Sequence, residues 1–303
     1  MKINAGKLFH CIYSAKFTPM KKRSRVLLLS LALALVLAKT TWSGEAQNAF
    51  NEGVKYHRDG KYKEAVAAYD RAIKAAPNAA EAYNNRGLAY HKLGQSGNAI
   101  KDYDEAIKLD PKLTDALYNR GNAHLLQKQY DRAIKDFDEV IKQNPKMPKA
   151  YDQRGHAYSG LGQFEQAIQD FNRSQKLNPK DSDVYYSRGL AYRRLGKHEL
   201  AVQDYSEAIK LEPKNADAYN NRANAYSLLG NFDRALKDYD DAIQLDPKNA
   251  RIYANRGMVK LRQGKSDDAQ KDFARAVELE PSLKEKIHAI TGDQKSAPAV
   301  KKQ

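Results

Sequence analysis

A proline recurs every 34 residues through most of this chain, at Pro77, Pro111, Pro145, Pro179, Pro213, Pro247 and Pro281. A constant period of this length is typical of repeat architectures, in which each unit buries its apolar surface against its neighbours. With the proline at position 32, the period divides the chain into seven units: 46–79, 80–113, 114–147, 148–181, 182–215, 216–249 and 250–283.

Each unit predicts two helices. In the second unit, Tyr83 and Tyr90 stand at positions 4 and 11, with Gly87 and Ala89 between them. Glycine at position 15 in six units predicts the end of the first helix. The second helix carries Ala at position 20 and Tyr or Phe at position 24 in every unit, so both lie on one helix face. Proline then ends this helix.

This pattern of aromatic, small and proline positions resembles the tetratricopeptide repeat family. The resemblance implies an all-α fold, a right-handed superhelical solenoid of seven helix-turn-helix repeats whose first helices line a concave groove. After the last unit, Leu283, Ile287 and Ile290 recur at helical spacing and predict a short capping helix over 284–292. Residues 293–303 read as a disordered tail.

Arg at position 7 and Asp at position 23 occur together in six units. Antiparallel helices that turn near position 15 bring these positions into register, so we predict a structural ion pair in each of the six rather than a catalytic site. In the first unit, Glu52 and Ala68 replace both partners; losing one alone would cost about 3–5 kcal/mol. The predicted pairs are Arg86–Asp102, Arg120–Asp136, Arg154–Asp170, Arg188–Asp204, Arg222–Asp238 and Arg256–Asp272.

The family resemblance assigns positions 2, 5, 6, 9, 12 and 13 of the first helices to the groove. An Asn side chain offers both a donor and an acceptor, so a column of Asn residues could hold the backbone of an extended peptide. The alternative is that these amides are solvated or hydrogen-bond a neighbouring helix. The ladder consists of Asn51, Asn85, Asn119, Asn221 and Asn255 at position 6, with Asn122 and Asn224 at position 9.

Position 5 of the groove carries aromatic residues in three units: Phe50, Tyr118 and Tyr186. Exposed aromatic side chains would anchor a partner, and packing against a neighbouring repeat is the alternative. No unit has Lys at position 5. The carboxylate clamp by which some members of the family bind chaperone C-termini requires that lysine, so this type of ligand is disfavoured.

The fourth unit interrupts the ladder with Asp152 and His156 at positions 5 and 9, and Ser187 replaces Asn in the fifth unit. Ser174 and Gln175 also replace apolar residues at the seam after the fourth unit. We expect these polar residues to loosen the stacking and to create a hinge or a partner-specific patch. Binding specificity is therefore expected near repeats four and five, with Asp152 and His156 as candidate binding residues.

The N-terminal region is typical of a targeting signal rather than of a part of the fold. A basic run begins at Met20 and precedes an apolar stretch over 26–38 that ends in Val36-Leu37-Ala38. This order is typical of a signal peptide cleaved after Ala38, with an uncleaved signal anchor or a buried helix as alternatives. We expect residues 1–19 to be a dispensable extension, 39–45 a linker, and the protein to be periplasmic or secreted. An inner-membrane anchored protein that faces the periplasm is the alternative.

The composition disfavours several classes of protein. Cys11 is the only cysteine, which excludes a disulfide framework. Of the 52 basic residues seven lie in 1–38, leaving 45 against 37 acidic ones with both signs interspersed, so no nucleic-acid partner is expected. His57 and His91 occupy one position in adjacent repeats, about 10 Å apart and too far to share a metal ion. No nucleotide-binding or hydrolase motif occurs.

These observations favour a non-enzymatic scaffold that takes protein or peptide partners and needs no cofactor or metal. We expect a role in assembly, secretion or envelope organisation. Two alternatives stay open. One is a membrane-anchored structural scaffold with an uncleaved signal, and the other is an accessory regulator that tethers an envelope hydrolase or protease.

Overall fold

The computed structural model describes residues 42–292, which form fifteen helices and no strand. The extension at 1–19, the signal at 20–38 and the tail at 293–303, all predicted from the sequence, lie outside the described residues. Across the described range, no helix is long and apolar enough to cross a membrane.

Fourteen of the helices form seven consecutive helix hairpins, one in each 34-residue unit. The first helices are α3 (Gly44–Arg58), α5 (Ala80–Lys92), α7 (Thr114–Leu126), α9 (Pro148–Gly160), α11 (Ser182–Arg194), α13 (Ala216–Leu228) and α15 (Ala250–Arg262). The second helices are α4 (Tyr62–Ala75), α6 (Ser96–Leu109), α8 (Tyr130–Gln143), α10 (Phe164–Leu177), α12 (His198–Leu211), α14 (Phe232–Leu245) and α16 (Ser266–Leu279). A last helix, α17 (Leu283–Gly292), follows α16 and contacts it.

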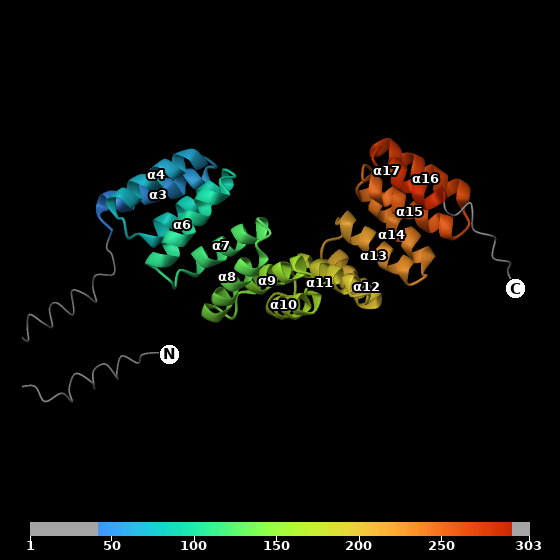
Figure 1. The fold of residues 1–303 in the computed structure, drawn as a ribbon, viewed down its shortest axis with the longest axis horizontal. Coiled ribbons are helices and arrows are strands. Elements are labelled where there is room, and N and C mark those ends of the chain that lie inside the picture. The colour runs from blue at the N-terminus through green and yellow to red at the C-terminus, as the bar shows by residue number, and fades with distance from the viewer. Residues whose placement is uncertain (1–41, 293–303) are drawn as a thin grey trace, which may run out of the picture.

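Each pair packs most closely within itself and next against the following pair, which is the arrangement of a solenoid. Figure 1 shows the pairs succeeding one another along a curved path, with α8 to α12 in the bend and the two ends of the array turned to the same side. The predicted all-α solenoid is confirmed. Its core is distributed over the repeats, because each unit buries its apolar surface against its neighbours.

The aromatic ring at position 24 forms the centre of each repeat. Tyr69, the first of these rings, is fully buried, and Phe273, the last, is only 3% exposed. A glycine at position 8 lets the ring approach the first helix: a Cβ added to Gly155 would lie 2.7 Å from the ring of Phe171. This close approach explains why position 8 is glycine in six repeats, with Ala223 of the sixth repeat as the exception.

The turn between the helices of a repeat requires a left-handed residue. Six repeats place a glycine there, with φ between 72° and 77°. The third repeat has Lys128 at this position, with φ of 58°. A residue with a Cβ pays steric repulsion in this region, so the turn of the third repeat is less favourable than the others.

The polar residues at the seam after the fourth repeat are accommodated in the packing. Ser174 is 1% exposed, and the Nε2 of Gln175 donates to the hydroxyl of Tyr185 in the next repeat at 3.0 Å. The hinge expected at this seam stays a prediction.

Candidate functional site

Six arginines at position 7 fix the first helices to the second helices. The structure brings together all six predicted Arg–Asp pairs. In each, Nε and Nη2 donate to the two carboxylate oxygens at 2.6–3.0 Å. The aspartates are only 4–6% exposed. Burial raises the pKa of Asp170 and Asp204 although the arginines lower it, so these carboxylates depend on their partners.

The third nitrogen of the same guanidinium reaches the preceding repeat, a contact that the sequence pairing of positions 7 and 23 does not predict. Nη1 donates at 2.5–3.0 Å to the side chain at position 25, which is Asp70, Asp104, Asp138, Asn172, Ser206 or Asp240 in chain order. The sequence contains a sign of this contact. Position 25 is polar in the first six units but is Ala274 in the seventh, which no further arginine-bearing unit follows.

The first repeat has no preceding repeat for an arginine to reach. Glu52 occupies position 7 there and pairs with Arg71 at 2.7 Å. The two side chains are 40% and 58% exposed, so this is a surface ion pair of small energetic weight. The paired replacement of Arg and Asp in this unit therefore follows from its place at the end of the array.

Three asparagines of the predicted ladder donate to the preceding first helix rather than to open solvent. In each case Nδ2 at position 6 donates to the side chain at position 5 one repeat earlier: Asn119 to Asn84 at 3.0 Å, Asn221 to Tyr186 at 2.9 Å and Asn255 to Asn220 at 3.1 Å. This corresponds to the alternative of hydrogen bonds to a neighbouring helix. Among the described residues the carbonyl oxygens of these three amides accept no hydrogen bond, so the column offers these acceptors together with the second N–H of Asn119 and of Asn255.

The remaining asparagines are placed differently. Asn85 donates to a backbone carbonyl of its own helix at 2.8 Å, and the exposed Asn51 accepts from a glutamine on its own helix. Asn224 accepts from the hydroxyl of Tyr239 at 2.8 Å and therefore faces the second helix of its repeat. Asn122 lies beside the tyrosine at position 5 of its own helix. The structure thus does not align all seven amides in one continuous ladder.

The three aromatic side chains at position 5 are half-buried and pack against the ring at position 24 of their own repeat. The ring centroids of Tyr118 and Tyr186 lie 5.9 Å from those of their partners. Phe50 lies 5.8 Å from its partner and also meets Trp42 edge to face at 4.6 Å. These rings are mainly core residues, although the hydroxyl of Tyr186 still lines the groove.

Asp152 and His156 lie one turn apart on α9, with His156 Nε2 3.5 Å from Asp152 Oδ1. This distance and the geometry leave Oδ1 buried without a hydrogen bond. Burial raises the pKa of Asp152, the neighbouring Asp181 and Asp183 raise it further, and His156 opposes them. Asp152 is therefore a buried carboxylate with one oxygen that accepts no hydrogen bond.

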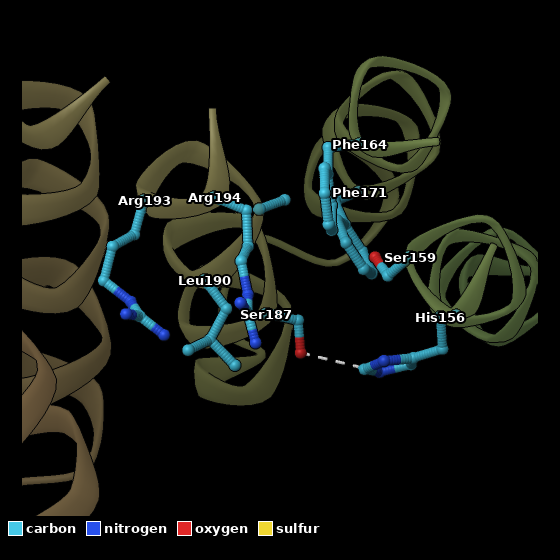
Figure 2. Close-up of a pocket in the computed structure, with 10 residues that line it drawn as sticks. His156, Ser159, Phe164, Phe171, Ser187, Leu190, Arg193 and Arg194 are labelled. Atoms are coloured by element: carbon cyan, nitrogen blue, oxygen red, sulfur yellow. Dashed lines mark hydrogen bonds between the residues drawn. The ribbon is translucent and has the colours of Figure 1, made fainter. Parts of the chain in front are cut away.

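A cavity of about 280 Å³ opens between the first helices of repeats four and five. Phe164 and Leu190 supply apolar surface, and His156, Arg193 and Arg194 supply polar surface. Figure 2 shows His156 and Ser187 facing each other, 3.5 Å apart, with Arg194 next to Ser187 and Arg193 farther to the left. His156 is thus a lining residue of a real hollow at the place where the interrupted ladder predicts specificity.

The cavity carries positive charge that the sequence pattern did not single out. Arg193 and Arg194 occupy groove positions 12 and 13, and neither forms an ion pair within residues 42–292. The Nε of Arg193 is buried and has no hydrogen-bond partner there. Two consecutive arginines at groove positions occur only in the fifth repeat, and this was the available signal.

A second hollow of about 660 Å³ adjoins the first, because Leu190 lines both. It extends along repeats five to seven and includes Tyr186, Asn221, Asp217 and Arg251. The two hollows are therefore neighbours and together border repeats four to seven. Within the described residues, no three His, Cys, Asp or Glu side chains come together in a way that could hold a metal ion.

Sequence comparison identifies the repeats. Profiles of the tetratricopeptide repeat match residues 80–113, 114–147 and 216–249, which coincide with units of the proline period, and another matches 238–271. A profile described as TPR repeat matches residues 53–94, 155–196 and 189–230. No curated protein sequence matches the chain significantly.

Several solved structures share the fold. MamA from Desulfovibrio magneticus RS-1 is 25% identical, with a TM-score of 0.55 over 58% of this chain and 99% of MamA. A tetratricopeptide repeat protein from Parabacteroides merdae is 21% identical, with a TM-score of 0.62 over 80% and 97% of the two chains. YrrB, described as a TPR protein with an unusual peptide-binding site, is 23% identical, with a TM-score of 0.54 over 65% and 98%.

The last two similarities concern the fold alone, while the profiles cover most of the described helices. Repeats of this kind form scaffolds for protein–protein interaction, and that broad description holds here. The predicted resemblance is confirmed, and the chain belongs to the tetratricopeptide repeat family.

Proposed function

We propose that this protein binds extended segments of partner proteins in the groove of its first helices and that it does so without catalysis. The observation that carries the proposal is the pair of adjoining hollows over repeats four to seven, joined at Leu190. Neighbouring hollows lined by side chains of successive repeats suit a ligand that runs along the array rather than a compact small molecule.

The hydrogen-bonding pattern of the groove supports the same kind of ligand. An extended segment has backbone N–H groups that need acceptors when they leave water. Asn119, Asn221 and Asn255 each donate inside the array, and their carbonyl oxygens accept no hydrogen bond within the described residues. The column of amides would therefore offer these carbonyl oxygens to the N–H groups of a bound backbone.

Leucine 190 offers a direct test, because one substitution intrudes into both hollows. The Leu190→Arg variant should lose the peptides that the wild-type protein enriches from a random peptide library. Leu200→Arg is the matched control, because Leu200 lies on the second helix α12, is 39% exposed and lines neither hollow. Circular dichroism and thermal melting check that both variants keep their helices. Equal enrichment by Leu190→Arg and the wild type would contradict binding in the groove.

The sequence before the repeats supports export as a further part of the proposal. The basic run and apolar stretch over 20–38 favour a periplasmic or secreted scaffold that serves assembly, secretion or envelope organisation. The alternatives are a membrane-anchored scaffold and a regulator that tethers a hydrolase or protease. Mass spectrometry of the mature N-terminus separates release from anchoring: a chain that begins at Lys39 supports release, and retention of residues 20–38 supports an anchor.

A further inference from the structure

The groove rim at position 13 is uneven in a way that the repeat pattern does not require. Leu126 in the third repeat is 68% exposed and Leu228 in the sixth is 54% exposed, more than any other large apolar side chain among the described residues. Between them stand Gly160 and Arg194. Gly160 has no side chain, and the ring of Tyr130 packs against it, since an added Cβ would collide with that ring.

The two exposed leucines thus bracket the positively charged cavity. Arg193 and Arg194 have no carboxylate partner within the described residues, and Arg193 Nε is buried and unsatisfied. An unsatisfied charged donor in a partly enclosed site is costly, and a carboxylate is the partner that best satisfies the fork of donors on a guanidinium. Apolar surface on either side of the cavity suits apolar side chains of the same ligand.

We infer that the groove over repeats three to six selects an extended protein segment with an internal acidic side chain, placed between two apolar ones. The acidic carboxylate binds Arg193 and Arg194, and the apolar side chains cover Leu126 and Leu228. This inference rests on the proposed groove binding and names the chemistry of its ligand. It differs from the carboxylate clamp, because the lysine at position 5 that the clamp needs is absent here.

The repeat geometry sets the spacing of the ligand residues. Successive first helices lie about 10 Å apart and an extended chain advances about 3.3 Å per residue, so each repeat spans about three residues. Leu126 lies two repeats before Arg194, and Leu228 lies one repeat after it. The acidic residue should therefore stand about six residues from one apolar residue and about three from the other.

The surroundings favour an internal acidic residue over other anions. A second hollow extends from the cavity along repeats five to seven, so a ligand need not end at the cavity. Asp183 and Asp217 occupy position 2 at the other end of α11 and α13 and repel a ligand with many negative charges, such as a nucleic acid. A single carboxylate between apolar side chains meets both conditions.

Fluorescence anisotropy with synthetic peptides tests the inference. The probe is an acetylated and amidated peptide of small polar residues that carries one glutamate and two leucines at the derived spacing, in both chain directions. We expect one direction to bind, and we expect glutamine in place of the glutamate to weaken binding about 10- to 100-fold. The Arg193→Gln/Arg194→Gln variant should bind the glutamate and glutamine peptides with equal affinity.

The control variant removes the same charge elsewhere on the rim. Arg58 and Arg262 also occupy position 13, in the first and seventh repeats. Arg58→Gln/Arg262→Gln should keep the full preference for glutamate. An equal loss in this control would overturn the inference in favour of a general charge effect. Tighter binding by a shorter peptide that ends in a free carboxylate at the glutamate position would also overturn it, because the internal position would be wrong.

The peptides also separate this inference from the proposed function. If wild type binds the glutamate and glutamine peptides equally and Leu190→Arg abolishes both, the acidic preference is wrong and groove binding stands. If neither these peptides nor any library peptide depends on Leu190, both are wrong.

Discussion

The junctions between repeats fall into two groups that differ in one side chain. At the outer junctions, between repeats one to four and between six and seven, the arginine at position 7 reaches an aspartate of the preceding repeat. At the two central junctions, on either side of repeat five, it reaches Asn172 and Ser206. The hydrogen bond is kept while the charge is lost, so the register between repeats depends on the hydrogen-bond geometry and not on an ion pair.

The two groups differ in whether the arginine keeps a carboxylate partner when the aspartate at position 23 is removed. Asp238→Ala leaves Arg222 with no carboxylate, because its other partner is Ser206, and should destabilise repeat six by about 3–5 kcal/mol. Asp102→Ala leaves Arg86 its bond to Asp70 and should cost less. Native-state hydrogen exchange of amides in each repeat measures both costs locally. Equal costs would remove the distinction between outer and central junctions.

The central region also holds Asp152, the buried carboxylate whose Oδ1 accepts no hydrogen bond. Asp152→Asn should stabilise the protein at neutral pH by about 1–2 kcal/mol, because it removes a buried charge without a full set of partners. Asparagine already occupies this position in two other repeats, as Asn84 and Asn220.

The raised pKa of Asp152 determines how the stability of the folded protein changes with pH. The folded state holds the proton more tightly than the unfolded state, so wild-type stability falls as pH rises from about 4 through the folded pKa. The variant should lack this decline. Urea titrations at several pH values compare the two proteins, and parallel pH profiles would show that Asp152 is not destabilising.

A reciprocal exchange tests whether charge distinguishes the junctions. Asn172→Asp should add an ion pair to the central junction and Asp138→Asn should remove one from an outer junction, each changing stability by about 0.2–1 kcal/mol in opposite directions. The effects should shrink in high salt, because Asp138 is 51% exposed on its side chain. Urea midpoints at low and high salt provide the measurement, and changes of the same sign would contradict the comparison.

The turn of repeat three provides the smallest expected effect. Lys128→Gly should stabilise the protein by about 0.5 kcal/mol, because glycine accepts the left-handed conformation and only part of the gain is lost to unfolded-state entropy. Thermal melting detects the change, with Lys112→Gly in the preceding loop as a control for the loss of a lysine. A decrease in stability would mean that unfolded-state entropy outweighs the strain.

Much of the fold could be predicted because its determinants are local and repeated. The proline period, the turn glycines and the pairing of Ala with an aromatic residue act within one unit, and each is stated several times in the chain. The pairing of positions 7 and 23 also lies within a unit, and simple helix register locates it. The candidate site could be predicted less completely, because the partner to which Asn119 or Asn221 donates lies in the neighbouring unit.

The period, the helix pairs, the buried rings and the partners inside each repeat could be read from the sequence, because these contacts follow from spacing along one hairpin. The packing of one repeat on the next establishes three further features. Nη1 of each arginine reaches the repeat before it, the amides of Asn119, Asn221 and Asn255 donate to the preceding first helix, and a hollow lies beside Leu190 and Arg193. Those contacts join residues about 16 to 35 positions apart in different repeats. They depend on the rotation from one repeat to the next, which the packing of whole helices sets and no single unit contains.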